Sequence, residues 1–284
     1  MTTSSLEQII NKTGLQRTMT AKENHQVALF LTDEHIPYID KGMVKVAEQY
    51  LQETKPRYRV HGGDLFDNPG MSIFDPDPNH KRDTQDEIDE TVQYLNRLHK
   101  ASPETEVIVL AGNHDVARLE RLKSTRSMGL KELRALDYKN LILESSKHQD
   151  LPIGEVTFAN EWYLGPDMVF THGDNRMDPR LLGGKTGARR TAENNNFGAR
   201  YVVMGHKHKM EVGSSTHKGR KTHVVGAMMD LDHKGYTHYS DYENGLLVVH
   251  YNPNVRPKPT YHIQNVVVTD NKDLMVDGKL YKAK

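Results

Sequence analysis

The stretch Tyr58-Arg59-Val60-His61-Gly62-Gly63-Asp64-Leu65-Phe66-Asp67 decides the fold. Its first four residues include aromatic and β-branched side chains and are too few for a helix. Such a run is typical of a buried strand when glycines end it. The two glycines let the backbone turn sharply off the strand and approach a ligand closely. We therefore predict a strand over residues 58–61 that delivers Asp64 to a site at its carboxyl end.

Four further short apolar runs end in residues that can bind metals or polar ligands. In an open α/β sheet, the loops after the strands face one crevice, which is where ligands bind. Residues two apart in extended backbone point the same way, so Asp33 and His35 can hold one metal. The predicted strands and the residues after them are 27–32 before Asp33-Glu34-His35, 107–110 before Gly112-Asn113-His114-Asp115, 168–171 before His172-Gly173-Asp174, and 201–204 before Gly205-His206-Lys207-His208.

Longer amphipathic stretches separate these strands, and the alternation favours an α/β fold built in layers. Apolar residues at helical spacing predict covering helices over residues 40–53, 83–101 and 128–136. Beyond residue 205, short apolar runs among Gly, Asn and Pro predict a second, largely antiparallel set of strands, and hence a core of two sheets. These runs lie at Val212, at Val224-Val225, over residues 246–249 and over residues 266–268.

The chain divides most simply into an N-terminal arm and one catalytic domain. Residues 1–25 carry only a weak helical stripe, which is compatible with an arm or with a poorly ordered leader. We see no internal repeat and no long linker after them. The expected division is therefore an arm over residues 1–25 and a single domain over residues 26–284.

Composition excludes several classes of protein. The 284 residues include 38 Lys and Arg against 38 Asp and Glu, so net charge indicates no partner. The longest apolar runs have five residues, far short of the roughly 20 that span a membrane. The first residues are polar, so we expect no secretory signal and a cytoplasmic location. With no cysteine, any metal must be held by His, Asp, Glu or Asn.

Five short motifs follow one another along the chain. They are D-x-H at residues 33–35, G-D-x-x-D at 63–67, G-N-H-D at 112–115, H-G-D at 172–174 and G-H-x-H at 205–208. Together, and in this order, they resemble the sequence blocks of the calcineurin-like metallophosphoesterase superfamily. The resemblance implies an α/β fold in which two sheets form an αββα sandwich. It also implies a dinuclear metal site at the carboxyl ends of the strands.

Matching the family blocks residue by residue implies which side chains bind the two metals. Asp64 would bridge them. His114 would stabilise the transition state or protonate the leaving oxygen, and Asp115 would orient its ring. One metal would be held by Asp33, His35, Asp64 and His208, and the other by Asp64, Asn113, His172 and His206.

Each of these residues has an ordinary structural interpretation when it is taken alone. An Asp at a strand end, such as Asp33 or Asp64, is more often a helix cap or a turn residue than a ligand. His172 alone could be a hydrogen-bonded core histidine. Coincidence would have to place seven ligand-type residues at strand ends in the family order, so the metal site is the stronger interpretation.

The ligand set also predicts the chemistry. Two divalent ions about 3.5 to 4 Å apart can share a hydroxide that attacks phosphorus near neutral pH, and can clamp the phosphoryl oxygens. Mixed His, Asp and Asn ligands suit transition ions better than an all-oxygen magnesium site. We expect two divalent metal ions, with Mn favoured and Fe, Zn or Ni as alternatives.

The substrate is less well determined. The blocks GDLFD at residues 63–67 and GNHD at 112–115 resemble most closely those of nuclease subunits of double-strand-break repair complexes, of the bacterial SbcD type. Asn68 and Asp115 depart from the phosphoprotein phosphatases, which have Arg and Glu there. His114 departs from the lipid-A pathway hydrolases, which have Arg. The chain is shorter than the repair nucleases and lacks an evident capping domain, so repair activity is not inherited with the motifs.

These observations favour a phosphodiesterase that acts on nucleic acid or nucleotides. The alternatives are a phosphomonoesterase acting on a small phosphorylated metabolite or a phosphoprotein, and a non-catalytic scaffold of the same fold. Neutral net charge argues mildly against a processive nucleic-acid binder. The sequence predicts no oligomeric state and no membrane partner. Basic residues that could contact the substrate, with solvated surface or ion-pair roles as the alternative, are Arg118, Arg176, Arg189 and Arg190.

Overall fold

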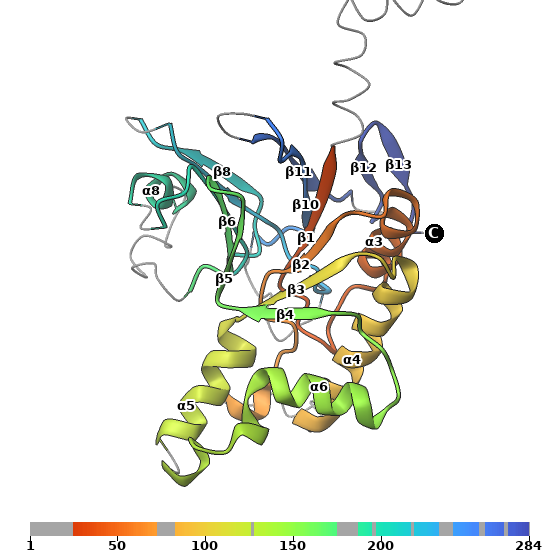
Figure 1. Ribbon diagram of the computed structural model, residues 1–284, viewed down its shortest axis with the longest axis vertical. Helices are drawn as coiled ribbons and strands as arrows, with labels where there is room; N and C mark the ends of the chain where they lie inside the picture. The colour runs from red at the N-terminus through yellow and green to blue at the C-terminus, as the bar shows by residue number, and fades with distance from the viewer. Residues whose placement is uncertain are drawn as a thin grey trace, which may run out of the picture.

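Two β-sheets pack face to face, and each carries helices on its outer face (Figure 1). The computed structural model describes residues 25–72, 83–125, 128–174, 187–194, 197–216, 219–232, 241–255, 259–269 and 272–283.

The first sheet has six strands in the order β11-β10-β1-β2-β3-β4. Its strands β1 to β4 run parallel to one another. Strand β10 is antiparallel to β1, and β11 is antiparallel to β10, so β11 runs in the same direction as β1. In register, Leu31 of β1 pairs with His61 of β2, so both strands end at the same level. The bounds are β1 Gln26–Leu31, β2 Tyr58–His61, β3 Glu106–Leu110, β4 Val156–Ala159, β10 Gly245–Asn252 and β11 Thr260–Val267.

The second sheet has five strands in the order β5-β6-β7-β9-β8. Strands β6, β7 and β9 are parallel, and the edge strands β5 and β8 are antiparallel to their neighbours. Apolar side chains from both sheets, including Phe30 on β1 and Phe170 on β6, fill the space between them. The bounds are β5 Glu161–Leu164, β6 Met168–Thr171, β7 Tyr201–Met204, β8 Glu211–Ser214 and β9 Lys221–Val224.

Amphipathic helices cover the outer face of the first sheet, and α8 covers the second (Figure 1). Asp40 caps α3 by accepting a hydrogen bond from the Met43 amide at 2.9 Å, and Asp83 caps α4 in the same way. None of the described helices is long and apolar enough to cross a membrane. The bounds are α3 Lys41–Thr54, α4 Thr84–Ala101, α5 Arg118–Thr125, α6 Tyr138–His148 and α8 Gly187–Glu193.

The predicted two-sheet α/β fold and its five strands that end in ligand-type residues are confirmed. The helix predicted over residues 128–136 is wrong: Met128–Leu130 and Arg134–Leu136 are short 3-10 turns, and the helix begins at Tyr138. Leu133 is 49% exposed, so its apolar side chain does not anchor a helix to the core. The expected N-terminal arm falls, apart from residue 25, outside the described residues.

The sequence predicts that the strands beyond residue 205 form a second set, and this prediction is wrong. Strands β8 and β9 join the second sheet, whereas β10 and β11 extend the first. Strand β10 is antiparallel to β1, with Gln26 opposite Tyr251 at one end and Phe30 opposite Leu247 at the other. The reason is burial on both faces of β10: Val248 faces the helices and Val249 faces the second sheet. A strand buried in this way belongs in the middle of a sheet.

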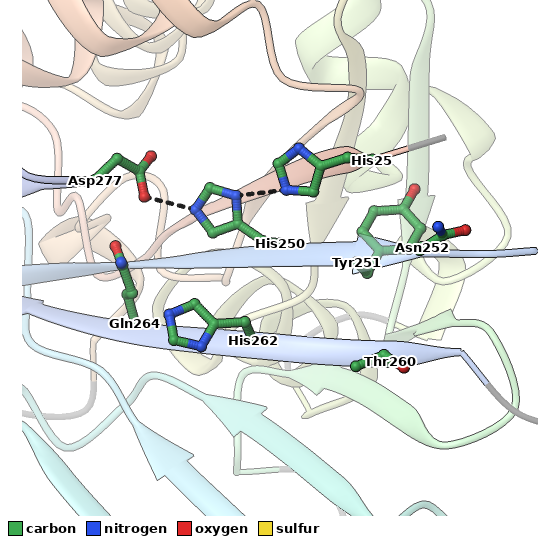
Figure 2. Close-up of a pocket in the computed structure, with 8 residues that line it drawn as sticks. All are labelled: His25, His250, Tyr251, Asn252, Thr260, His262, Gln264 and Asp277. Carbon is green, nitrogen blue, oxygen red and sulfur yellow. Dashed lines mark hydrogen bonds and ion pairs between the residues drawn. The ribbon is translucent and has the colours of Figure 1, made fainter. Parts of the chain in front are cut away.

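A polar chain ties the C-terminal hairpin, β12 Leu274–Val276 and β13 Lys279–Tyr281, to the rest of the fold (Figure 2). Asp277 lies in its turn and accepts hydrogen bonds from Tyr50 Oη at 3.1 Å and from His250 Nε2 at 2.7 Å. His250 Nδ1 lies 2.8 Å from His25 Nε2, at the start of β1. One carboxylate thus connects α3, β10 and the hairpin.

We expect replacement of Asp277 by alanine to reduce the free energy of unfolding by about 1 to 3 kcal/mol, because hydrogen bonds to a charged group are lost. The turn also becomes strained, since Asp277 has φ +55°. Asp277→Asn is the matched control: asparagine tolerates this φ and keeps one acceptor, so its loss should be smaller. Urea unfolding measures both, and an unchanged midpoint in Asp277→Ala would contradict this account.

Candidate metal centre

The loops after five strands meet where the carboxyl ends of the two sheets converge. Strands β1, β2 and β3 of the first sheet and β6 and β7 of the second each supply at least one of the predicted ligand residues. The structure brings all seven of these residues into two adjoining clusters. Five are buried, and Asn113 and His206 are partly exposed.

The first cluster consists of Asp33, His35 and His208. His208 Nε2 lies 3.2 Å from Asp33 Oδ1 and 3.1 Å from His35 Nε2. Asp33 and His35 come from the loop after β1, and His208 comes from the loop after β7 in the other sheet. The two sheets therefore build this cluster jointly.

The second cluster consists of Asn113, His172 and His206. His172 Nε2 lies 2.9 Å from Asn113 Oδ1 and 3.2 Å from His206 Nδ1. Asn113 begins a π-helical turn, Asn113–Ala117, directly after β3. His172 follows β6, so this cluster also draws on both sheets.

Asp64 lies between the two clusters. Its Oδ2 atom is 3.3 Å from His172 Nε2 and 3.8 Å from His35 Nε2. Its other oxygen, Oδ1, accepts a hydrogen bond from the His114 amide at 2.8 Å. One oxygen is thus held by the backbone and the other faces both clusters, which is the arrangement that a bridging ligand requires.

The tautomers of two histidines fit metal binding. His172 Nδ1 donates to the Gly62 carbonyl at 2.9 Å, and His35 Nδ1 lies 3.0 Å from Asp67 Oδ1. Each contact uses Nδ1, so Nε2 is the nitrogen that faces the cluster, as in histidine ligands of metals. Donors about 2.0 to 2.2 Å from a common ion lie about 3 to 3.5 Å apart. The separations of 2.9 to 3.2 Å described above are close to this range, and His35 Nε2 and Asp33 Oδ1 are wider apart at 4.0 Å. The residues therefore fit two divalent ions.

Five of the seven residues have left-handed backbone conformations: φ is +54° at Asp33, +46° at His35, +54° at Asp64, +70° at His206 and +53° at His208. Non-glycine residues rarely adopt this region, and such strain concentrates at functional sites. The compact loops turn sharply at the strand ends and direct the side chains into the two clusters.

Two motif glycines are required by close approach. A Cβ atom at position 112 would lie 2.2 Å from Asp64 Oδ1, and one at position 205 would lie 2.5 Å from Asp33 Oδ2. The Asp33 carboxylate also accepts a hydrogen bond from the His206 amide at 2.9 Å. The glycines of G-N-H-D and G-H-x-H thus let one loop's backbone pack against the next loop's carboxylate.

Histidines and carboxylates in the two clusters shift one another's pKa values. Burial alone would raise the pKa of Asp33, but the neighbouring His208 and His172 lower it to about 2. Burial would lower the pKa of His172, but the carboxylates of Asp64 and Asp33 outweigh burial and raise it well above its ordinary value. These carboxylates are therefore charged, and His172 holds a proton that a metal must displace.

His114 lies beside the clusters, but Asp115 does not orient its ring as predicted. His114 Nδ1 lies 2.8 Å from Asp67 Oδ1, the second carboxylate of G-D-x-x-D. The Asp115 carboxylate accepts from the amides of Leu65 and Gly112 and so holds the loop backbone instead. Asp67 lies three positions after Asp64, a spacing that could have suggested this role.

The predicted substrate contacts divide into three cases. The Arg118 guanidinium donates to the Asp67 carbonyl at 2.5 Å and lies 3.3 Å from His114 Nε2, beside the candidate site. Arg189, on α8, is exposed and forms an ion pair with Glu193, and Arg190 is on the same helix. Arg176 falls outside the described residues.

Metal binding should release protons. The raised pKa of His172 means that the metal-free protein carries a proton there near neutral pH, and a ligand must be deprotonated to bind. Apparent Mn²⁺ affinity should therefore fall about tenfold for each pH unit below that pKa, per proton released. Calorimetry at pH 7 in two buffers of different ionisation enthalpy measures the release. Identical heats in both buffers would contradict the assignment.

Comparison with known proteins found one matching family and several similar structures. The sequence profile of the calcineurin-like phosphoesterases matches residues 28–210. A search of curated proteins found no match. Similar solved structures include Vacuolar Protein Sorting 29 from Cryptosporidium parvum (13% identity, TM-score 0.42, 85% of this chain and 97% of that one). Chaetomium thermophilum Vps29 (13%, 0.39, 86% and 97%) and PhoD (12%, 0.43, 92% and 72%) are also similar.

The profile covers well over half of the chain and includes every strand whose following loop contributes to the two clusters. The chain therefore belongs to the calcineurin-like phosphoesterase family.

Proposed function

We propose that this protein is a two-metal phosphodiesterase whose substrate is nucleic acid or a nucleotide. The observation that carries the proposal is the position of His114, the residue that we propose transfers a proton, next to two clusters that fit metals. Its Nε2 atom lies 3.9 Å from Asp64 Oδ2. A protein that used this fold only as a scaffold would have no need for a histidine held in this position.

The residues proposed to hold the ions are the two clusters with Asp64 between them. One ion would bind Asp33, His35, Asp64 and His208, and the other Asp64, Asn113, His172 and His206. When bound, the ions supply Lewis-acid activation of water and neutralise charge on the phosphoryl oxygens. The mixed nitrogen and oxygen donors favour a transition ion, and we propose Mn²⁺.

His114 is placed to deliver a proton to the leaving oxygen. Burial disfavours its charged form, but the carboxylates of Asp64 and Asp67 outweigh burial and raise the pKa of His114 above its ordinary value. Asp67 holds Nδ1, which leaves Nε2 as the ring atom that would pass a proton to the substrate. Because arginine has only donors, Nε2 accepts in its 3.3 Å contact with Arg118 and would have to leave that contact to carry the proton. Arg118 contacts the same ring and the Asp67 carbonyl, and we propose that it positions the ring.

Support for a diester comes from the sequence blocks. GDLFD at residues 63–67 and GNHD at 112–115 are similar to those of repair nucleases. The leaving group of a nucleic-acid diester is an alkoxide, which needs a proton more than p-nitrophenolate does. A positioned acid such as His114 suits that demand. The proposal therefore makes a specific statement about leaving groups.

We expect manganese-loaded protein to hydrolyse bis-p-nitrophenyl phosphate faster than p-nitrophenyl phosphate. His114→Ala should bind metal normally but lose about 10² to 10⁴ of turnover on diesters with alkoxide leaving groups, and less on the p-nitrophenyl diester. Asp64→Asn is the control that should lose metal and activity together. Steady-state rates and metal content measure these effects.

Preference for the monoester would replace this proposal by a phosphomonoesterase. Absence of both activities in metal-loaded protein would replace it by a non-catalytic role. Equal loss of metal in His114→Ala and Asp64→Asn would show that His114 is a ligand and not the proton donor.

A further inference from the structure

Three ionisable side chains form a buried chain behind the candidate metal centre. Arg59 and His61 lie on β2, and Glu34 follows β1; all three are 0% exposed. Arg59 Nε lies 3.1 Å from His61 Nε2, and His61 Nδ1 lies 2.6 Å from Glu34 Oε1. None of the three belongs to the proposed ligand set.

The chemistry of arginine fixes where the protons are. Arginine has only donors, so the Nε2 atom of His61 must accept from Arg59. The ring proton is then on Nδ1, which donates to Glu34. Burial and the nearby Arg59 also hold the pKa of His61 well below its ordinary value, consistent with a neutral ring. The hydrogen bonds therefore run in one direction, from the Arg59 guanidinium through the neutral His61 ring to the Oε1 atom of Glu34.

Its endpoint lies between two strained ligand residues. Glu34 separates Asp33, with φ +54°, from His35, with φ +46°. Non-glycine residues rarely adopt this region, and the strain persists only where surrounding contacts hold it. Asp33 and His35 face the first cluster, whereas Glu34 extends away from it to His61.

Its other end lies on the strand that supplies Asp64. His61 is the last residue of β2, and the Asp64 loop begins directly after it. The backbones of the two loops are also joined, since the His35 amide donates to the Asp64 carbonyl at 2.9 Å. The Tyr94 ring of α4 packs edge-on against His61 at 5.8 Å between centroids. The chain thus connects the first two ligand loops through the core under α4.

Stability alone does not account for such a chain. A protein in which well-packed apolar residues replace buried charged and polar groups is often as stable or more stable, because desolvation of such groups opposes folding. Polar side chains at all three positions therefore indicate a role other than stabilising the fold. The role that the geometry supports is to fix the positions of Asp33 and His35.

We propose that Arg59, His61 and Glu34 are positioning residues that fix Asp33 and His35 relative to Asp64 and so set the affinity of the first cluster for its ion. This inference rests on the two-metal site of the proposed function. It adds a layer of residues that the ligand motifs do not include, because only the middle position of D-x-H contributes to it.

The test measures metal binding by the full chain. Calorimetric titration of metal-free protein with Mn²⁺ should resolve two binding steps. Glu34→Leu should weaken one step at least tenfold and leave the other within about twofold, because no hydrogen bond or ion pair joins Glu34 to Asn113, His172 or His206. Glu34→Gln keeps the acceptor for His61 and should recover most of the lost affinity. Leu98→Ala, a core substitution in α4, is the control for loss of stability alone and should bind as the unsubstituted protein does.

A second readout reports the chain directly. Long-range proton–nitrogen NMR correlations should show His61 as the neutral Nδ1–H tautomer in the unsubstituted protein and in Glu34→Gln, with His61→Asn identifying its signals. An Nε2–H tautomer would overturn the proposed chain even if Glu34→Leu does not fold.

The outcomes separate this inference from the proposed function. Two binding steps of unchanged affinity in folded Glu34→Leu, or an equal loss in Leu98→Ala, would overturn the positioning role and leave the enzyme intact. Two normal binding steps without hydrolysis would overturn the proposed function and leave the positioning role standing. Failure of the unsubstituted protein to bind two ions would overturn both.

Discussion

The contact between Asp64 and His172 joins the two sheets at their carboxyl ends, and the rest of the site depends on it. Asp64 Oδ2 lies 3.3 Å from His172 Nε2, across the boundary between the sheets. Neither group is stable in a buried position unless the other balances its charge. The parallel register of β1 with β2 and of β6 with β7 aligns the strand ends that make this contact. The fold can therefore be understood as a means of bringing these loops together.

The strands that carry the site could be predicted from sequence because their signals are local. A short apolar run, a glycine and a ligand-type residue lie next to one another at 58–64 and at 107–113. The sheet to which β10 belongs could not, because pairing with β1 joins residues more than 200 positions apart. The apolar residues at 128–136 have helical spacing and so predict a helix there, but Leu133 among them is exposed, and the helix forms at Tyr138–His148 instead.

The candidate ligands followed from motif order, whereas their supporting contacts did not. Asp67, and not Asp115, holds the His114 ring, because the turn after Asp64 brings the Asp67 carboxylate to His114 Nδ1. The chain from Arg59 to Glu34 crosses two strands, and nothing in the motif D-x-H marks its middle residue. Such contacts depend on loop conformations with positive φ, which no local pattern predicts for Asp or His.

Diffraction at the manganese absorption edge would test the central claim that Asp64 bridges two metals. In a crystal of the protein soaked in Mn²⁺, the account predicts two anomalous peaks, one on each side of Asp64 Oδ2 and about 3.5 to 4 Å apart. One peak should lie among Asp33, His35 and His208, and the other among Asn113, His172 and His206. A single peak that Asp64 does not contact, or none in either cluster, would contradict the account.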